Sequence, residues 1–164
     1  MIREAKPTDC VDLAALSIQV WLHTYATDGV REKISRYVLN NFTEQQFLNF
    51  LNRPEIKVLV YIKDEHLVGF VTVDLTSEYE SEGNGYEIST LYVSEHFHGM
   101  GIGRQLLCKV QAQFGLPFWL STWEGNVNAI GFYHKLGFKM IGEVNFDLDG
   151  EFYNNHVLQL SKSL

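Results

Sequence analysis

A glycine-rich turn between an expected strand and an expected helix constrains this chain more than any other feature. Residues 86–93 (YEISTLYV) are rich in β-branched and aromatic side chains, which is typical of a half-buried strand. Apolar residues then recur at helical spacing across residues 102–114. Between the two segments, Gly99, Gly101 and Gly103 leave backbone N–H groups unobstructed where a helix begins. Because those N–H groups lack partners and the helix dipole is positive there, the stretch predicts a phosphate-binding loop.

Two common phosphate-binding motifs do not fit this loop. The dinucleotide fingerprint needs a third glycine at the position of Arg104, and the P-loop needs a Gly-Lys-Ser/Thr ending, which is absent. Residues 98–103 (HGMGIG) instead resemble the Gln/Arg-x-x-Gly-x-Gly/Ala loop of the GCN5-related N-acetyltransferases. His98 stands where that family usually has Gln or Arg. A structural turn without a ligand is the alternative interpretation.

A second segment carries the same resemblance. Residues 119–138 (WLSTWEGNVNAIGFYHKLGF) are similar to the family's other motif, in which a strand leads to Asn-x-x-Ala-x-x-x-Tyr and ends in Gly-Phe. Here Asn126, Ala129 and Tyr133 occupy the three motif positions. The two motifs follow in the family's order, and the resemblance covers nearly the whole chain. From Glu87 to Phe138 it is closest to the spermidine/spermine acetyltransferase branch typified by PaiA.

The resemblance implies an α+β fold, a three-layer α/β/α sandwich. Its sheet would have about seven strands, mixed but mostly antiparallel, with helices on both faces and two parallel central strands that splay apart. Acetyl-coenzyme A would be the co-substrate, and its pantetheine arm would pair with exposed strand backbone. The residues implied as coenzyme contacts are Leu91, Tyr92, Val93, His98, Gly99, Met100, Gly101, Ile102, Gly103, Arg104, Asn126 and Tyr133.

Two further positions bear on catalysis. An alkyl amine with a pKa near 10.4 is neutral in about one molecule in a thousand at pH 7, which costs about 4 kcal/mol unless a group removes its proton. Glu87 matches the position of a catalytic glutamate in many family members, often acting through water. Tyr133 matches a tyrosine held near the coenzyme sulfur, where it would donate a hydrogen bond to the departing thiolate. The alternatives are a solvent-facing glutamate at a strand edge and an aromatic core residue.

The acceptor is expected to be a primary amine, with a small polyamine as the first hypothesis. The resemblance implies Trp21, Tyr25, Glu87 and Trp123 as substrate contacts, and the acidic loop 76–85 could form a lip for a cation. The alternatives are a protein N-terminus, a lysine or an amino acid as acceptor, an ordinary solvated loop, and a non-catalytic acetyl-coenzyme A sensor. Binding alone does not need Tyr133, so its presence favours an enzyme.

Composition sets the remaining limits. With 164 residues and no linker or repeat, the chain is expected to be one domain, residues 1–164. The net charge of −7 argues against nucleic acid as a partner. We also expect no membrane span, a cytoplasmic location because Cys10 and Cys108 are far apart, and a possible homodimer. No metal is expected, because His96 and His98 have no supporting ligand at a suitable spacing.

Local patterns predict most of the other elements. Residues 56–63 alternate with period two and pair with residues 67–75, where Gly69 marks a bulge or a close backbone approach. Asp149-Gly150 predicts a hairpin turn between two C-terminal strands. We expect a first helix capped by Thr8 and ending at about Trp21, and a later helix opened by a capping box at Thr43.

Overall fold

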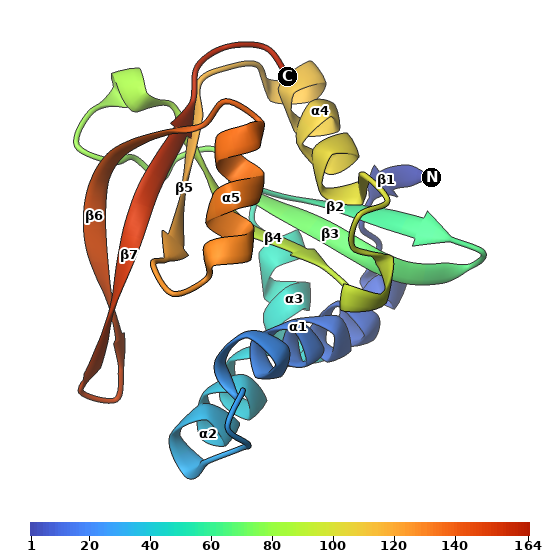
Figure 1. The fold of residues 1–164 in the computed structure, drawn as a ribbon. Coiled ribbons are helices and arrows are strands. Elements are labelled where there is room, and N and C mark those ends of the chain that lie inside the picture. The colour runs from blue at the N-terminus through green and yellow to red at the C-terminus, as the bar shows by residue number, and fades with distance from the viewer.

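The computed structural model describes all residues, 1–164, and its centre is a seven-stranded mixed sheet (Figure 1). The strand order is β1-β2-β3-β4-β5-β7-β6, and every neighbouring pair is antiparallel except β4 and β5. The strands are β1 (Ile2–Glu4), β2 (Ile56–Lys63), β3 (His66–Asp74), β4 (Tyr86–Val93), β5 (Phe118–Trp123), β6 (Lys139–Leu148) and β7 (Glu151–Leu160).

Helices cover both faces of this sheet. They are α1 (Cys10–Tyr25), α2 (Glu32–Asn41), α3 (Glu44–Leu51), α4 (Ile102–Phe114) and α5 (Val127–Lys135). The helices α4 and α5 pack on one face, around a core that includes Leu106, Val110 and Tyr133 (Figure 1). The helices α1 and α3 pack on the other face, through Leu13 and Phe47. The expected three-layer arrangement is therefore confirmed.

The N-terminal region corrects two predictions. Thr8 is not an N-cap: it lies inside a 3-10 turn, Pro7–Asp9, that precedes α1. Asp9 organises this turn instead, because its carboxylate accepts from the Lys6 backbone N–H at 2.7 Å and from the Arg3 guanidinium at 2.7 and 2.9 Å. The helix α1 also continues beyond Trp21 to Tyr25, whose ring stacks on Trp21 with centroids 4.1 Å apart.

The other local predictions are confirmed in outline. Thr43 caps α3, with its hydroxyl accepting from the Gln46 N–H at 3.1 Å. A register shift lies beside Gly69, where a Cβ atom would stand 3.0 Å from the Tyr92 carbonyl oxygen. Asp149 and Gly150 have φ of 50° and 84°, as the tight turn between β6 and β7 requires. No helix combines the length and apolar character needed to cross a membrane.

The parallel pair at the centre of the sheet separates after two residues. Tyr86 pairs with Phe118 and Glu87 with Trp119, and no further pairing joins β4 to β5. Beyond that point β4 remains paired with β3 and β5 remains paired with β7. The edge of β4 from Ile88 to Val93 is consequently free of strand partners on the β5 side, which is the expected splay.

Candidate active site

Two glycines of the loop before α4 adopt a backbone conformation that other residues rarely take. Gly99 has φ of 79° and Gly101, the N-cap of α4, has φ of 75°. A Cβ atom on Gly99 would meet nothing within 4 Å, and one on Gly101 would meet only the Gln105 amide, at 3.8 Å. These two glycines therefore allow the positive φ angles of the loop, and no other residue packs against them. The space in front of the first turn of α4 is open. An approaching phosphate needs this combination.

Gly103 serves a different purpose that its place in the motif did not reveal. A Cβ atom there would lie 3.0 Å from Cζ of Phe132 on α5. The absence of a side chain lets α5 pack directly on the start of α4. In this way the two sequence motifs are joined by one tight contact.

The unusual residue of the loop, His98, folds back on β4. Its Nε2 atom lies 2.9 Å from the carbonyl oxygen of Val93 and donates to it, since a carbonyl oxygen can only accept. This bond ties the loop to the end of β4. The positive side chain nearest the start of α4 is then Arg104, which is exposed.

Tyr133 lies deep in the face covered by α4 and α5. Only 7% of its surface is exposed, and its ring lies 5.2 Å from those of Phe132 and Phe138. Burial raises the pKa of this phenol well above its ordinary value. Tyr133 is thus a neutral O–H donor at any pH at which the protein works.

Asn126 acts as the N-cap of α5. Its side-chain oxygen accepts from the Ala129 N–H at 3.4 Å, which gives a structural reason for the Asn-x-x-Ala spacing. Only the amide nitrogen of Asn126 is left for the predicted contact with pantetheine. The predicted backbone contacts, Leu91 to Val93, lie on the part of β4 that β5 leaves unpaired.

Glu87 is half-buried and faces the opposite side of the sheet from Tyr133. Its neighbour Ile88 is buried with Tyr133 beneath α4 and α5, and successive strand residues point to opposite faces. Burial raises the pKa of the Glu87 carboxyl, the charge of Asp74 adds to this, and the Ser77 hydroxyl opposes it. The two candidate catalytic residues therefore lie on opposite sides of the sheet near the opening between β4 and β5.

The face that bears Glu87 also carries an aromatic pocket of about 440 Å³. Tyr25 and Trp123 have ring centroids 5.3 Å apart, and each contacts Tyr153 of β7, at 5.9 and 5.8 Å. Burial raises the pKa of Tyr25 to about 12. The lining residues are Tyr25, Thr27, Asp28, Gly29, Val30, Arg31, Ile34, Trp123 and Tyr153.

The lining of this pocket differs from the predicted substrate contacts: Trp21 and Glu87 are not part of it, and Tyr153 is. Trp21 is 6% exposed and lies among Tyr25, Tyr37 and Phe146, so it supports the pocket wall from behind rather than lining it. Tyr153 was missed by sequence reasoning. The only available signal was the period of two in the last strand, which places its side chain on the same face as residues 155 and 157.

The acidic loop 76–85 packs over the far end of the same face. Its Tyr79 ring lies 5.7 Å from Trp119, the residue paired with Glu87. Asn84 of the loop accepts hydrogen bonds from Gln159 at 3.2 and 3.3 Å. Glu78, Glu80 and Glu82 are exposed. No group of three or more potential ligands among His, Cys, Asp and Glu is arranged to hold a metal ion.

Comparison with known proteins identifies the family. Residues 18–138 match the model of the acetyltransferase (GNAT) family. An uncharacterized N-acetyltransferase of Mycobacterium tuberculosis is 28% identical over 155 residues, covering 92% of this chain and 96% of that protein. A spermine/spermidine N(1)-acetyltransferase of Bacillus subtilis is 27% identical over 88 residues, 49% of this chain and 58% of that protein.

A solved structure shows the same fold. The PaiA N-acetyltransferase from Thermoplasma acidophilum, in complex with coenzyme A, has a TM-score of 0.78 and 23% identity and covers 99% of this chain and 98% of that one. The chain therefore belongs to the acetyltransferase (GNAT) family and is an N-acetyltransferase. The family interpretation and the fold predicted from the two motifs are both confirmed.

Proposed function

We propose that this N-acetyltransferase moves an acetyl group from acetyl-coenzyme A directly to a primary amine of a small polyamine. The observation that carries the proposal is the opening between β4 and β5, with Tyr133 on one side of the sheet and Glu87 on the other. A thioester approaching over α5 and an amine approaching from the opposite face can meet there. Neither reactant has to cross the sheet.

The residues present fit the coenzyme. Gly99 and Gly101 supply an open helix N-terminus for the pyrophosphate, with the exposed Arg104 beside it. The unpaired edge of β4 offers backbone groups to the amides of the pantetheine arm. When bound, acetyl-coenzyme A supplies the activated acyl group, and no metal is required.

The protein contributes at both ends of the transfer. Glu87, directly or through water, takes a proton from the ammonium form of the acceptor, and its raised pKa makes it a stronger base than an exposed glutamate. Tyr133 donates a hydrogen bond to the departing thiolate. Full proton transfer from a phenol of pKa about 10 to a thiolate of about 8.5 is uphill by about 2 kcal/mol, and burial of Tyr133 makes it more so.

Charge and similarity favour a polyamine acceptor. Asp74 lies opposite Glu87 in the β3–β4 register, and the exposed glutamates of the acidic loop are close to the same face. These carboxylates, with the net charge of −7, raise the local concentration of a polycation. The similarity to the Bacillus subtilis spermine/spermidine N(1)-acetyltransferase points the same way, and the similarity to the PaiA N-acetyltransferase is consistent with it.

A panel of acceptors tests the proposal. Thiol release from acetyl-coenzyme A is measured with spermidine, spermine, single amino acids and a short peptide. We expect turnover with the polyamines that weakens with added salt, because exposed attractions are screened over about 10 Å at 0.1 M. Acetylation of only the peptide or an amino acid would refute the polyamine acceptor. Tight coenzyme binding with no turnover on any amine would instead indicate a sensor.

A further inference from the structure

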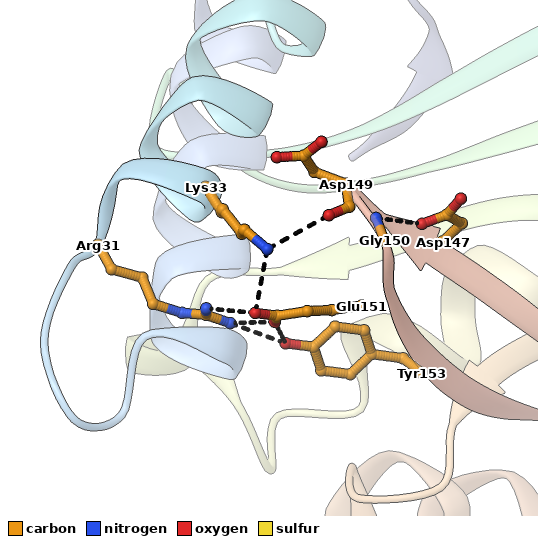
Figure 2. Close-up of polar contacts among 7 residues, drawn as sticks. All are labelled: Arg31, Lys33, Asp147, Asp149, Gly150, Glu151 and Tyr153. Carbon is orange, nitrogen blue, oxygen red and sulfur yellow. Dashed lines mark hydrogen bonds and ion pairs between the residues drawn. The ribbon is translucent and has the colours of Figure 1, made fainter.

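A network of ion pairs joins the α1–α2 loop to the β6–β7 hairpin, two segments about 120 residues apart in the chain (Figure 2). Arg31 binds the Glu151 carboxylate with both terminal nitrogens, Nη1 to Oε1 at 2.8 Å and Nη2 to Oε2 at 2.6 Å. Tyr153 joins this pair, because its hydroxyl accepts from Arg31 at 3.1 Å and donates to Glu151 at 3.3 Å. We call Arg31, Glu151 and Tyr153 the clasp.

Lys33 reinforces the clasp from the first turn of α2. Its Nζ atom lies 3.3 Å from the Asp149 carbonyl oxygen and 3.4 Å from Glu151. The hairpin tip is itself fixed by Asp147, which accepts from the Gly150 N–H at 2.7 Å (Figure 2). The Arg31 guanidinium, followed by Lys33, lowers the pKa of Glu151 to about 2. The carboxylate is therefore charged throughout the working pH range.

The clasp forms one wall of the aromatic pocket. Arg31 and Tyr153 both line that pocket, together with Trp123 of β5, whose ring centroid lies 5.8 Å from that of Tyr153. Apart from the clasp, the loop that covers the pocket is held by backbone hydrogen bonds at its two ends, from the Gly29 N–H to the Ala26 carbonyl oxygen and from the Ser35 N–H to the Arg31 carbonyl oxygen, each at 3.0 Å. Gly29 there has φ of 104° with open space around it, and Val30 is 69% exposed. Arg31 is the residue of this loop that joins it to the β6–β7 hairpin.

The pocket lies at a defined distance from the candidate base. Trp119 pairs with Glu87, and Trp123 is four residues further along β5. At about 3.3 Å per residue this separation is roughly 13 Å. An extended acceptor whose reacting nitrogen is at Glu87 therefore reaches the aromatic pocket with its other end. The ring faces there suit an alkyl chain or an ammonium group.

We propose that the Arg31–Glu151 clasp is a length filter: it closes the far end of the acceptor pocket and excludes amines longer than the span from Glu87 to the clasp. The inference rests on the proposed transfer to a small amine. Arg31 and Glu151 act here by positioning the pocket wall, since neither contacts the reacting atoms.

Loss of the clasp leaves the fold intact. The helix α2 is anchored separately, by Ile34 and Val38, each 2% exposed, in an apolar cluster with Leu148 and Trp21. A second ion pair, Arg36 with Glu32, lies on α2 at 2.7 Å and is fully exposed. It is also an Arg–Glu pair, and neither of its residues lines the pocket, so Arg36→Gln is a matched control.

The test is a ladder of α,ω-diamines of four to twelve carbons with acetyl-coenzyme A. Wild type and Arg36→Gln are expected to lose tenfold or more in kcat/KM between the shortest and longest diamines. Arg31→Gln and Glu151→Gln should reduce that loss to threefold or less, chiefly through KM. The charge swap Arg31→Glu with Glu151→Arg should restore the wild-type profile in part, because Lys33 then faces a cation in place of the Glu151 carboxylate. Parallel length profiles in all variants would overturn the filter while leaving the amine acceptor standing.

Acrylamide quenching of tryptophan fluorescence tests the closure without any substrate. Trp21 and Trp119 are 6% and 7% exposed, so the accessible signal comes from half-buried Trp123 at the pocket. The quenching constant should rise in Arg31→Gln and Glu151→Gln, and fall back toward the wild-type value in the charge swap. An unchanged constant in the single variants would refute the filter. Failure of every diamine as a substrate would refute the proposed function instead.

Discussion

The contact between Gly103 and Phe132 yields a prediction in which two effects of known size oppose each other. Replacing a glycine within a helix by alanine ordinarily gains about 0.5–1 kcal/mol in the free energy of unfolding. In Gly103→Ala, however, the new methyl group would lie 3.0 Å from Cζ of Phe132, tighter than nine in ten Cβ contacts, so the Phe132 ring, which is itself packed against Tyr133, has to shift by a few tenths of an ångström. Overpacking of this kind costs about 1–3 kcal/mol. The strain therefore outweighs the gain, and Gly103→Ala should be less stable by about 1–2 kcal/mol.

Helix α5 provides the matched control. Gly131 also lies inside a helix, but a Cβ atom there would meet nothing within 4 Å. Gly131→Ala should therefore show the propensity gain alone, about 0.5–1 kcal/mol of added stability. The two variants make the same chemical change and are predicted to shift stability in opposite directions. The sign, rather than the size, separates packing from propensity.

Thermal and urea unfolding measure both variants. For a chain of this length, 1 kcal/mol corresponds to about 2–4 °C in Tm, so Gly103→Ala should melt about 2–8 °C lower. Adding Phe132→Leu should recover part of the loss, because the shorter side chain frees the space that the methyl group needs. If Gly103→Ala melts at or above the wild-type temperature, α4 and α5 do not pack as closely as the structure indicates, and the reasoning fails.

Three further predictions address the site itself. Gly101→Asp should nearly abolish coenzyme binding, measured by calorimetry on folded protein, because it places a side chain at a left-handed backbone position and a negative charge in front of the phosphate. Unchanged affinity would show that the pyrophosphate does not bind at this loop. Tyr133→Phe should lower kcat about tenfold or more with coenzyme affinity little changed, and wild-type turnover would return Tyr133 to a packing role. Glu87→Gln should depress turnover most near neutral pH and recover partly at alkaline pH, where free amine is abundant. Because burial raises the pKa of Glu87, the acidic limb of the wild-type profile should lie above the usual glutamate range, and a limb unaffected by Glu87→Gln would remove it as the base.

The sequence predicted those parts of the fold whose cause is local. Alternation with period two predicted β2 and, with it, the partner strand β3 that contains Gly69. Asp149-Gly150 predicted the last hairpin, because few other residue pairs accept the backbone angles of its turn. The glycine loop was predicted for the same reason. Thr8 shows the limit of such reasoning. A threonine before a helical pattern is a common cap, but here the partly buried ion pair of Asp9 with Arg3 fixes the 3-10 turn from which the helix begins.

The parts that the sequence could not supply arise from contacts between distant segments. Nothing near Arg31 indicates that its partner is Glu151, 120 residues later. The sequence predicts Gly103 to be one more glycine of the phosphate-binding loop, whereas its contact with Phe132 gives it a packing role. Trp21 and Tyr25 were assigned to the pocket together, and only packing with Tyr37 and Phe146 shows that Trp21 lies behind it. Residue type and spacing identify which side chains face the core, whereas neighbours across the sheet decide their roles.

The separation of β4 from β5 gives these distant contacts a common purpose. A continuous sheet would keep Tyr133 and Glu87 on faces that no small reactant could bridge. The two strands instead pair at Tyr86 and Glu87 and then part, so Glu87, the proposed base, stands at the last paired position, where the opening begins. The reaction needs two opposite electrostatic effects. The departing thiolate must be stabilised as an anion, whereas the ammonium form of the acceptor must lose a proton. Placing a neutral phenol on one face and a carboxylate on the other meets each demand without the two groups neutralising each other.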